Sequence, residues 1–487
     1  MTGGDEAGLI LNRSRKLCED VINMVKKLIC VYLFSLSIFI GPNYGQTRSE
    51  ISTRNSNGLE NEVNAYIKPY LDIGGFNGTI LIAKKGKVLL GKGYGMANYE
   101  LSVPNQSRTK FHLGSVSKTF TAAAIMILQE QGKLSVRDPL TKFIPDYPNG
   151  DKITLHHLLT NTSGIPNVNN FPEYDTQSKF PHTPADIVEM FKQKPLDFEP
   201  GTRDYTESNS NYNLLAYIIE KLSGQSYGEF LKQNIFDPLG LNDTGHDGNA
   251  LAVLSNKASG YAPAGLTDFE NVPFLDWSIK TGNGSIYSTV EDLYRWDRSL
   301  YTDKILKKSS RDQMFNNGYG WFAGKRLNRN VVRMNGRSPG FNSEMQRYVD
   351  DDVCIIVLSN NYIPTASIIV SDLARIVFGE KYETPKLVRP PRVDPKILES
   401  YVGRYQFGPD FFAPRGIYEF KMDKGQLLMR APGADATLVP QSEREFFDRP
   451  FWSMIVFVEN TEGKVTHFLW RYGGKDYKAI KVVEIFR

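Results

Sequence analysis

The sequence predicts a protein of mixed α/β (α+β) class over its larger N-terminal part, followed by a smaller part made of β-strands. Three observations support this division. Two β-rich runs, 78–83 and 87–94, flank Lys-Lys-Gly, which is a hairpin signal. Apolar residues recur at helical spacing from Phe120 to Leu128. Beyond residue 395, short β-rich runs follow one another and predict successive antiparallel strands.

The composition is that of an ordinary globular protein. Hydrophobic residues make up 41% of the 487 residues and charged residues 23%. The 58 Lys and Arg nearly balance the 54 Asp and Glu, which gives a net charge of +4, and no basic run is clustered. We therefore predict no nucleic-acid partner.

The first 45 residues have the order of a secretory signal. Lys26 and Lys27 precede an apolar stretch from Leu28 to Ile40, and the turn-prone segment Gly41 to Gly45 follows. This stretch of about 13 residues is short for a membrane span, which needs roughly 20. We expect residues 1–45 to be a leader, with the mature protein periplasmic or secreted in a bacterium and no stable membrane span after its removal. A single retained membrane anchor is the alternative.

Loss of this leader removes Cys18 and Cys30 and leaves Cys354 as the remaining cysteine. One cysteine cannot form an internal disulfide. Because Cys354 lies in an apolar, strand-like run, we expect a small core residue rather than a reactive thiol.

The mature chain is predicted to fold as two domains. Glu62 to Leu71 predicts a helix ahead of the hairpin. Four prolines punctuate a short basic segment, which indicates a linker at 385–395 between a domain at 46–384 and a domain at 396–487. In the second domain, strands are predicted at 418–422, 426–430, 454–459 and 464–470.

A serine and a lysine three residues apart begin the central helical segment. Ser115 and Lys118 precede its apolar residues, and Gly132 ends the run. Side chains three apart on a helix are neighbours, so the Lys118 amine can reach the Ser115 hydroxyl. A serine hydroxyl needs a base within hydrogen-bond distance to become a strong nucleophile. We expect the first turn of a buried helix to carry Ser115 as nucleophile and Lys118 as the group that activates it.

This Ser-x-x-Lys motif with its flanks, together with the segment Ile153 to Pro166, resembles the serine β-lactamases and penicillin-binding proteins. The nearest branch is similar to class C β-lactamases, D,D-peptidases and related esterases, over about residues 60–380. The resemblance implies an antiparallel sheet flanked by helices, with a helical domain beside it. It also implies a serine hydrolase that forms an acyl-enzyme on Ser115 from amide, ester or lactam carbonyls.

The C-terminal part carries a second resemblance. Its segments 401–405, 445–447 and 463–466 are similar to the small lipocalin-like β-barrel often appended to such hydrolases. The aromatic and apolar residues there are interpreted as barrel core.

The family's second motif, Tyr-x-Asn, is altered in this chain. Counted back from Tyr212, Asn209 takes the asparagine position, where it contacts the substrate amide, and Glu207 takes the tyrosine position. Counted forward from Gly201, Tyr205 falls close to the tyrosine position. We name Tyr205 and Asn209 as candidate catalytic residues, and leave open which of Tyr205 and Glu207 faces Lys118.

The family's third motif is Lys-Thr-Gly or His-x-Gly on a strand that lines the site. Here Gly336 fits, but Met334 replaces the cation, and Arg337 offers a substitute charge. The resemblance implies that the backbone N–H groups of Arg337 and Ser115 form the oxyanion hole, so Gly336 and Arg337 are candidate substrate-binding residues. A literal Lys-Thr-Gly at 280–282 precedes a Gly-rich loop and is disfavoured.

The leading hypothesis is therefore acyl transfer. The alternative is a catalytically weakened, penicillin-binding-like binding protein, because Met334 and Glu207 depart from the family's proton-transfer groups. No His-Glu-x-x-His or Cys-x-x-Cys motif is present, which disfavours metal chemistry. We expect a small-molecule or peptide substrate and no cofactor, and the sequence predicts no oligomeric state.

Overall fold

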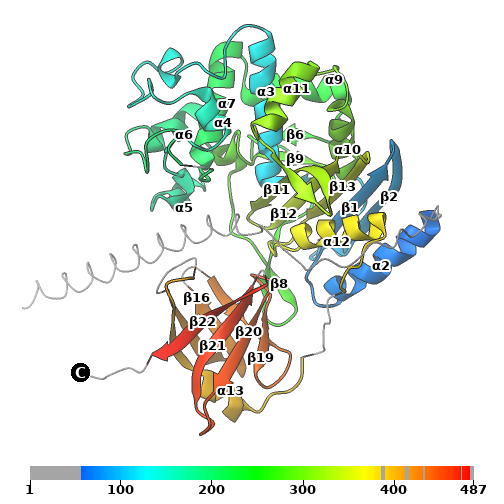
Figure 1. The fold of residues 1–487 in the computed structure, drawn as a ribbon, viewed down its shortest axis with the longest axis vertical. Coiled ribbons are helices and arrows are strands. Elements are labelled where there is room, and N and C mark those ends of the chain that lie inside the picture. Colours follow the sequence, from blue (N-terminus) through cyan, green and yellow to red (C-terminus); the bar gives the residue numbers. More distant parts are fainter. Residues whose placement is uncertain are drawn as a thin grey trace, which may run out of the picture.

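The computed structural model describes residues 56–203, 205–384, 390–411, 416–431, 434–472 and 474–482. The predicted leader at 1–45 lies outside these ranges. Figure 1 shows a larger part, with helices on both sides of a sheet, above a smaller part made mainly of β-strands. The predicted α/β (α+β) class is confirmed, and so is the β-only C-terminal part. In the described part of the chain, no helix has both the length and the apolar character to cross a bilayer.

A six-stranded antiparallel sheet forms the centre of the larger part. The predicted hairpin supplies two of its strands, and β1 pairs with both β2 and the late strand β13. The sheet order is β10-β11-β12-β13-β1-β2. The strands are β1 (Gly78–Lys84), β2 (Lys87–Tyr94), β10 (Phe322–Arg326), β11 (Arg329–Ser338), β12 (Phe341–Tyr348) and β13 (Val353–Ser359).

Strand β13 shows why both faces of this sheet are covered. Successive side chains of a strand point to opposite faces, and every residue of β13 is buried. Val353, Ile355 and Val357 pack against α2 (Ser56–Asp72) and α12 (Ala366–Phe378). Cys354 and its alternate neighbours belong to the core shared with the other helices. The prediction of a buried core cysteine is confirmed, and burial raises the pKa of the Cys354 thiol.

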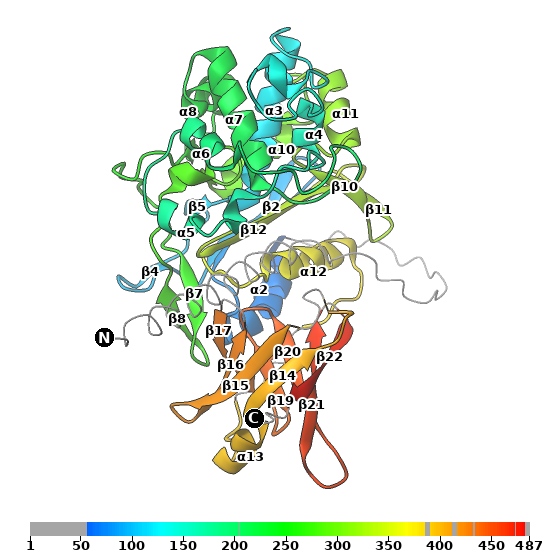
Figure 2. The ribbon, with the colours of Figure 1, turned by 90° about the vertical axis from the view of Figure 1, so that its left-hand side faces the viewer.

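The helices lie on opposite sides of the sheet. In Figures 1 and 2, α2 and α12 cover the face toward the C-terminal part, and the remaining helices gather on the other face. At the centre of that second group, α3 (Ser117–Glu130) is buried from residue 117 to residue 128. Its three alanines and its apolar side chains all round are typical of a helix inside a large core.

Of the other helices of this region, α7 has 15 residues and the rest have 10 or fewer. The α-helices are α4 (Leu155–Leu159), α5 (Tyr174–Gln177), α6 (Pro184–Phe191), α7 (Asn209–Ser223), α8 (Tyr227–Leu231), α9 (Asp237–Leu239), α10 (Val290–Ser299) and α11 (Lys308–Asn316). The 3₁₀ turns are η1 (Gly114–Val116), η2 (Leu140–Lys142), η3 (Val168–Asn170) and η5 (Trp277–Lys280), and η4 (Lys232–Phe236) is a π-helix.

Three small sheets complete the larger part. The first joins β5 (Phe111–His112), β9 (Ile286–Ser288) and β6 (Gly245–His246) directly ahead of η1. The others are hairpins: β3 (Met96–Asn98) with β4 (Val103–Pro104), and β7 (Tyr261–Ala264) with β8 (Asp268–Asn271).

The C-terminal part is a strongly curved nine-stranded antiparallel sheet preceded by α13 (Pro395–Tyr401). Its two end strands, β17 and β18, follow each other in the chain, so the sheet is nearly closed into a barrel. The four predicted strands are confirmed, while the lipocalin-like identity stays a prediction. The strands are β14 (Gly403–Phe407), β15 (Ile417–Asp423), β16 (Gln426–Ala431), β17 (Ala434–Thr437), β18 (Val439–Pro440), β19 (Glu445–Asp448), β20 (Ser453–Glu459), β21 (Val465–Tyr472) and β22 (Lys475–Val482).

The turn between β19 and β20 docks this sheet on the larger part (Figure 2). The Trp452 ring stacks on Tyr70 of α2, with the ring centroids 5.3 Å apart. The Arg449 guanidinium is 1% exposed. It donates hydrogen bonds to main-chain carbonyls of the larger part, those of Gly74, Ala264, Gly265, Thr267 and Asp268, at 3.0–3.5 Å.

Candidate active site

Ser115 and Lys118 lie between strand β5 and the body of the buried helix α3. Ser115 lies in the 3₁₀ turn η1, and Lys118 lies in the first turn of α3 directly after it. We expected the first turn of the α-helix to carry both residues. Instead, Ser115 lies in a tighter 3₁₀ turn that directly precedes the helix, and Lys118 lies in the helix itself. The Lys118 Nζ donates a hydrogen bond to the Ser115 Oγ at 3.1 Å. Lys118 is 1% exposed, whereas Ser115 is only half-buried.

Two glycines allow strand β11 to lie directly against this turn. Gly114 has a φ of +54°, and a Cβ there would lie 2.7 Å from the Arg337 main-chain N. A Cβ on Gly336 would lie 1.9 Å from the Leu113 O and 2.9 Å from the Ser115 N. The backbone of β11 at Gly336 and Arg337 therefore packs against the backbone of the turn that carries Ser115.

Glu207 is the residue that reaches the lysine amine. Its Oε1 accepts a hydrogen bond from the Lys118 Nζ at 3.3 Å, and its side chain is 7% exposed. Its other oxygen, Oε2, is buried and has no hydrogen-bond partner in the described part of the chain. The Lys118 Nζ also lies 5.5 Å from the centre of the Tyr212 ring.

Tyr205 lines the same small cavity as Lys118. Its ring lies 5.5 Å from the ring of Phe322, and Met334 also faces this cavity. Tyr205 lies two residues before Glu207, and both approach Lys118: Tyr205 lines the cavity that Lys118 lines, and Glu207 makes a hydrogen bond with its amine. Glu207 accepts a hydrogen bond from the amine, and a catalytic role for Tyr205 stays a prediction.

Asn209 begins α7 and is held by two asparagines of the η3 turn. Its main-chain N donates to the Asn167 Oδ1 at 3.2 Å, and its Nδ2 donates to the Asn169 Oδ1 at 3.1 Å. Its Oδ1 is buried, with no partner among the described residues. This oxygen can accept a hydrogen bond from a substrate N–H. The sequence analysis missed Asn167 and Asn169; the run of asparagines after Pro166 is the signal that could have indicated them.

Arg337 and Lys280, the two cations considered for the third motif, each lie over an aromatic ring. The Arg337 guanidinium lies 3.9 Å from the centre of the Tyr362 ring, and its Nε donates to the Tyr362 O at 3.2 Å. Lys280 ends η5, outside the central sheet, and lies 5.3 Å from the centre of the Tyr174 ring. These positions support Gly336 rather than the 280–282 triplet as the counterpart of the third motif.

His112, three residues before Ser115, is engaged elsewhere. Its Nε2 lies 2.8 Å from the Asp247 Oδ2, and its ring stacks on Trp277 at 3.5 Å between centroids. Burial lowers the pKa of His112 to about 4, so the ring is neutral at pH 7. Asp247 was not singled out from the sequence. No group of three or more His, Cys, Asp or Glu side chains within the described ranges is arranged to hold a metal ion.

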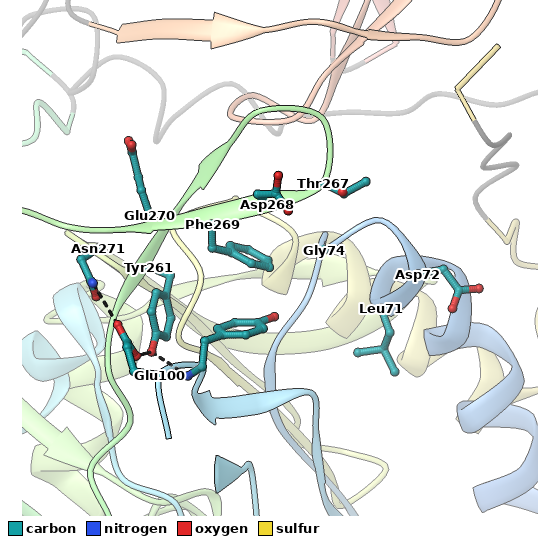
Figure 3. Close-up of a pocket in the computed structure, with 11 residues that line it drawn as sticks. Leu71, Asp72, Gly74, Glu100, Tyr261, Thr267, Asp268, Phe269, Glu270 and Asn271 are labelled. Carbon is teal, nitrogen blue, oxygen red and sulfur yellow. Dashed lines mark hydrogen bonds between the residues drawn. The ribbon is translucent and has the colours of Figure 1, made fainter. Parts of the chain in front are cut away.

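A larger cavity, of about 620 Å³, lies next to the docking turn of the C-terminal part (Figure 3). Tyr99 and Phe269 stack in its wall at 5.0 Å between ring centroids. Glu100 accepts hydrogen bonds from the Tyr261 hydroxyl and the Asn271 amide, as Figure 3 shows. Ser115 and Lys118 are not among the residues that line it, so it is not the catalytic cleft.

Comparison with known proteins agrees with this geometry. A β-lactamase family model matches residues 63–374. Penicillin-binding protein 4* of Bacillus subtilis is 30% identical over 433 residues, covering 82% of this chain and 94% of that protein. An octameric penicillin-binding protein homologue from Pyrococcus abyssi has a TM-score of 0.59 at 25% identity, covering 88% of this chain and 100% of the other. D-amino acid amidase from Ochrobactrum anthropi shares the fold, with a TM-score of 0.60 at 21% identity over 66% of this chain and 99% of the amidase.

Proposed function

We propose that this chain, which belongs to the β-lactamase family of serine hydrolases, cleaves amide, ester or lactam carbonyls through an acyl-enzyme on Ser115. The observation that carries the proposal is the 3.1 Å hydrogen bond between the Lys118 amine and the Ser115 hydroxyl. A lysine that touches a serine hydroxyl in a site shielded from water is the arrangement that activates such a nucleophile.

In the proposed reaction, the Ser115 Oγ attacks the carbonyl carbon and the carbonyl oxygen becomes an oxyanion. The main-chain N–H groups of Ser115 and Arg337 donate hydrogen bonds to this oxyanion, and such donors are worth about 10²–10³ in rate. The close packing of Gly114 and Gly336 supports this assignment, because it brings the two backbones together. Water then releases the acyl group from Ser115.

The substrate side of the proposal rests on Asn209. Its buried Oδ1 lacks a protein donor in the described ranges, and an unpaired buried acceptor is costly. A substrate N–H next to the reacting carbonyl would satisfy this oxygen. We therefore favour peptide-like amides and acylamino lactams over simple esters, with Gly336 and Arg337 as the other substrate-binding residues.

The organisation of the chain belongs to the same proposal. We propose a hydrolase domain at 46–384, a linker at 385–395 and a β-barrel domain at 396–487, in a protein exported from the cell. The aligned Bacillus protein covers 82% of this chain, which supports a shared two-part layout.

The alternative is a penicillin-binding-like protein that binds without rapid turnover. Two observations favour it. Met334, 4% exposed, replaces the cation of the third motif, and Glu207 pairs with Lys118 in place of a tyrosine.

Labelling of the purified full chain with a fluorophosphonate and a fluorescent penicillin tests both functions. The wild type is expected to take up one label on Ser115, and Ser115→Ala none. Ser255→Ala, which changes an exposed serine, is the matched control and is expected to label like the wild type. Steady release of the penicillin label supports the hydrolase, a penicillin label that stays bound supports the alternative, and the absence of both labels from Ser115 overturns the acyl-enzyme.

A further inference from the structure

Attack by Ser115 requires a destination for its hydroxyl proton. A lysine can take that proton only if it is neutral or gives one of its own protons away in the same step. In the family pattern the tyrosine of the second motif and the cation of the third assist this transfer. In this chain Glu207 and Met334 stand at those positions.

We propose that Glu207 is the proton acceptor of this site and that the proton reaches it through Lys118. This inference rests on the proposed function. Two hydrogen bonds form an unbroken path: 3.1 Å from the Ser115 Oγ to the Lys118 Nζ, and 3.3 Å from that Nζ to the Glu207 Oε1. The first distance lies within the range of about 2.6–3.2 Å over which general acid–base groups pass a proton, and the second lies just above it, as catalytic hydrogen bonds often do before substrate binds.

The burial of the pair favours transfer along this path. The Lys118 and Glu207 side chains are 1% and 7% exposed, so bulk water has little access to either charge. The Glu207 Oε2 is buried without any donor in the described part of the chain. The two side chains are therefore held in contact with little competition from bulk water for their hydrogen bond.

Other groups around Lys118 are less suited to accept the proton. The Tyr212 hydroxyl donates to the Leu159 O at 2.9 Å, and burial raises the pKa of Tyr212, which keeps it protonated. Met334 has no titratable group. His112 is paired with Asp247 and stacked on Trp277. Tyr205 lines the same cavity as Lys118, and the variants below discriminate it from Glu207.

The transfer balances as follows. The Ser115 O–H bond breaks as the bond from Oγ to the carbonyl carbon forms. The proton joins the Lys118 Nζ, and one N–H proton of the ammonium moves to the Glu207 carboxylate. The oxyanion then holds the negative charge, Lys118 remains an ammonium and Glu207 is a neutral acid. As the tetrahedral intermediate collapses, the two steps run in reverse and deliver a proton to the leaving nitrogen or oxygen.

The test compares single-turnover acylation rates of the full chain. Glu207→Gln keeps a side chain that can accept from Lys118 but cannot take its proton. It is expected to acylate about 100-fold more slowly, with unchanged substrate affinity, since general acid–base groups contribute roughly 10²–10⁴ in rate. Glu207→Asp, which restores a carboxylate, is expected to recover at least about tenfold of this loss. Glu199→Gln is the matched control, because Glu199 is 68% exposed, 3.7 Å from Lys152, and is expected to match the wild type.

A measurement on the unaltered protein makes the test independent of folding. In mixtures of H₂O and D₂O, two protons in motion predict a curved dependence of the acylation rate on the deuterium fraction. Full-rate acylation by Glu207→Gln, an Asp variant no faster than the Gln variant, or a linear dependence each overturns the role of Glu207. A wild type that takes up no label fails the proposed function instead, so the two failures are distinct.

Discussion

Replacement of Gly336 by alanine tests whether the close packing of β11 positions the nucleophile. The new Cβ would lie 1.9 Å from the Leu113 O, 2.7 Å from the Ser343 Oγ and 2.9 Å from the Ser115 N. Non-bonded heavy atoms prefer separations of about 3.5 Å or more. The strand and the η1 turn must therefore separate by roughly 1 Å or more to admit the methyl group.

The size of the expected effect follows from this displacement. A misplacement of about 1 Å at a reacting centre costs on the order of 100-fold in rate. That factor corresponds to about 2.7 kcal/mol of activation free energy. Overpacking at the same contact is expected to lower the free energy of unfolding by about 1–3 kcal/mol, so the variant should remain folded at room temperature while its reactivity falls.

The assay is the rate constant for fluorophosphonate labelling of Ser115, with thermal unfolding followed in parallel. Gly324→Ala is the control within the same sheet, because no atom lies within 4 Å of the added Cβ. It is expected to label and unfold like the wild type. If folded Gly336→Ala labels within about threefold of the wild-type rate, the contact between β11 and η1 does not set the position of Ser115, and the reasoning is refuted.

Two further predictions concern stability. Arg449→Met removes a buried donor from main-chain carbonyls and should lower the free energy of unfolding by about 3 kcal/mol. Arg430→Met, which breaks an exposed pair with Asp435, should cost less than about 1 kcal/mol, and equal urea midpoints for the two variants would contradict this. Burial raises the pKa of Asp448 to about 7, from 3.8 when exposed. The unfolded chain ionises first, so the stability that the neutral carboxyl contributes is complete below about pH 4 and is lost as the pH rises to about 7. Asp448→Asn should therefore gain up to about 4 kcal/mol relative to the wild type between pH 4 and pH 8, and a urea midpoint difference that does not change with pH would disprove it.

The sequence predicted the parts of this fold that follow a regular period. The hairpin, the buried helix and the C-terminal strands each repeat apolar residues at a fixed spacing, so local pattern and tertiary burial agree.

The candidate site was predicted in part. The three-residue spacing of Ser115 and Lys118 indicated their contact, since that spacing is local. The segment between Gly201 and Asn209 has no period, and two alignments placed either Tyr205 or Glu207 at the amine. The choice depends on how this irregular segment crosses α3, which is a tertiary property. The position of Arg449 was likewise beyond prediction, because its partners are main-chain carbonyls that carry no sequence signal.

The buried guanidinium of Arg449 has a consequence for anyone who divides this chain. The proline-rich segment is an obvious place to truncate the chain, and the N-terminal part alone would retain Ser115 and Lys118. In that truncated protein, the Tyr70 side chain would no longer be covered by Trp452. The main-chain carbonyl oxygens near Gly74 would also lose Arg449, their common hydrogen-bond donor. If a truncated protein aggregated or reacted poorly, the cause would be this newly exposed surface rather than the loss of an activity of the barrel.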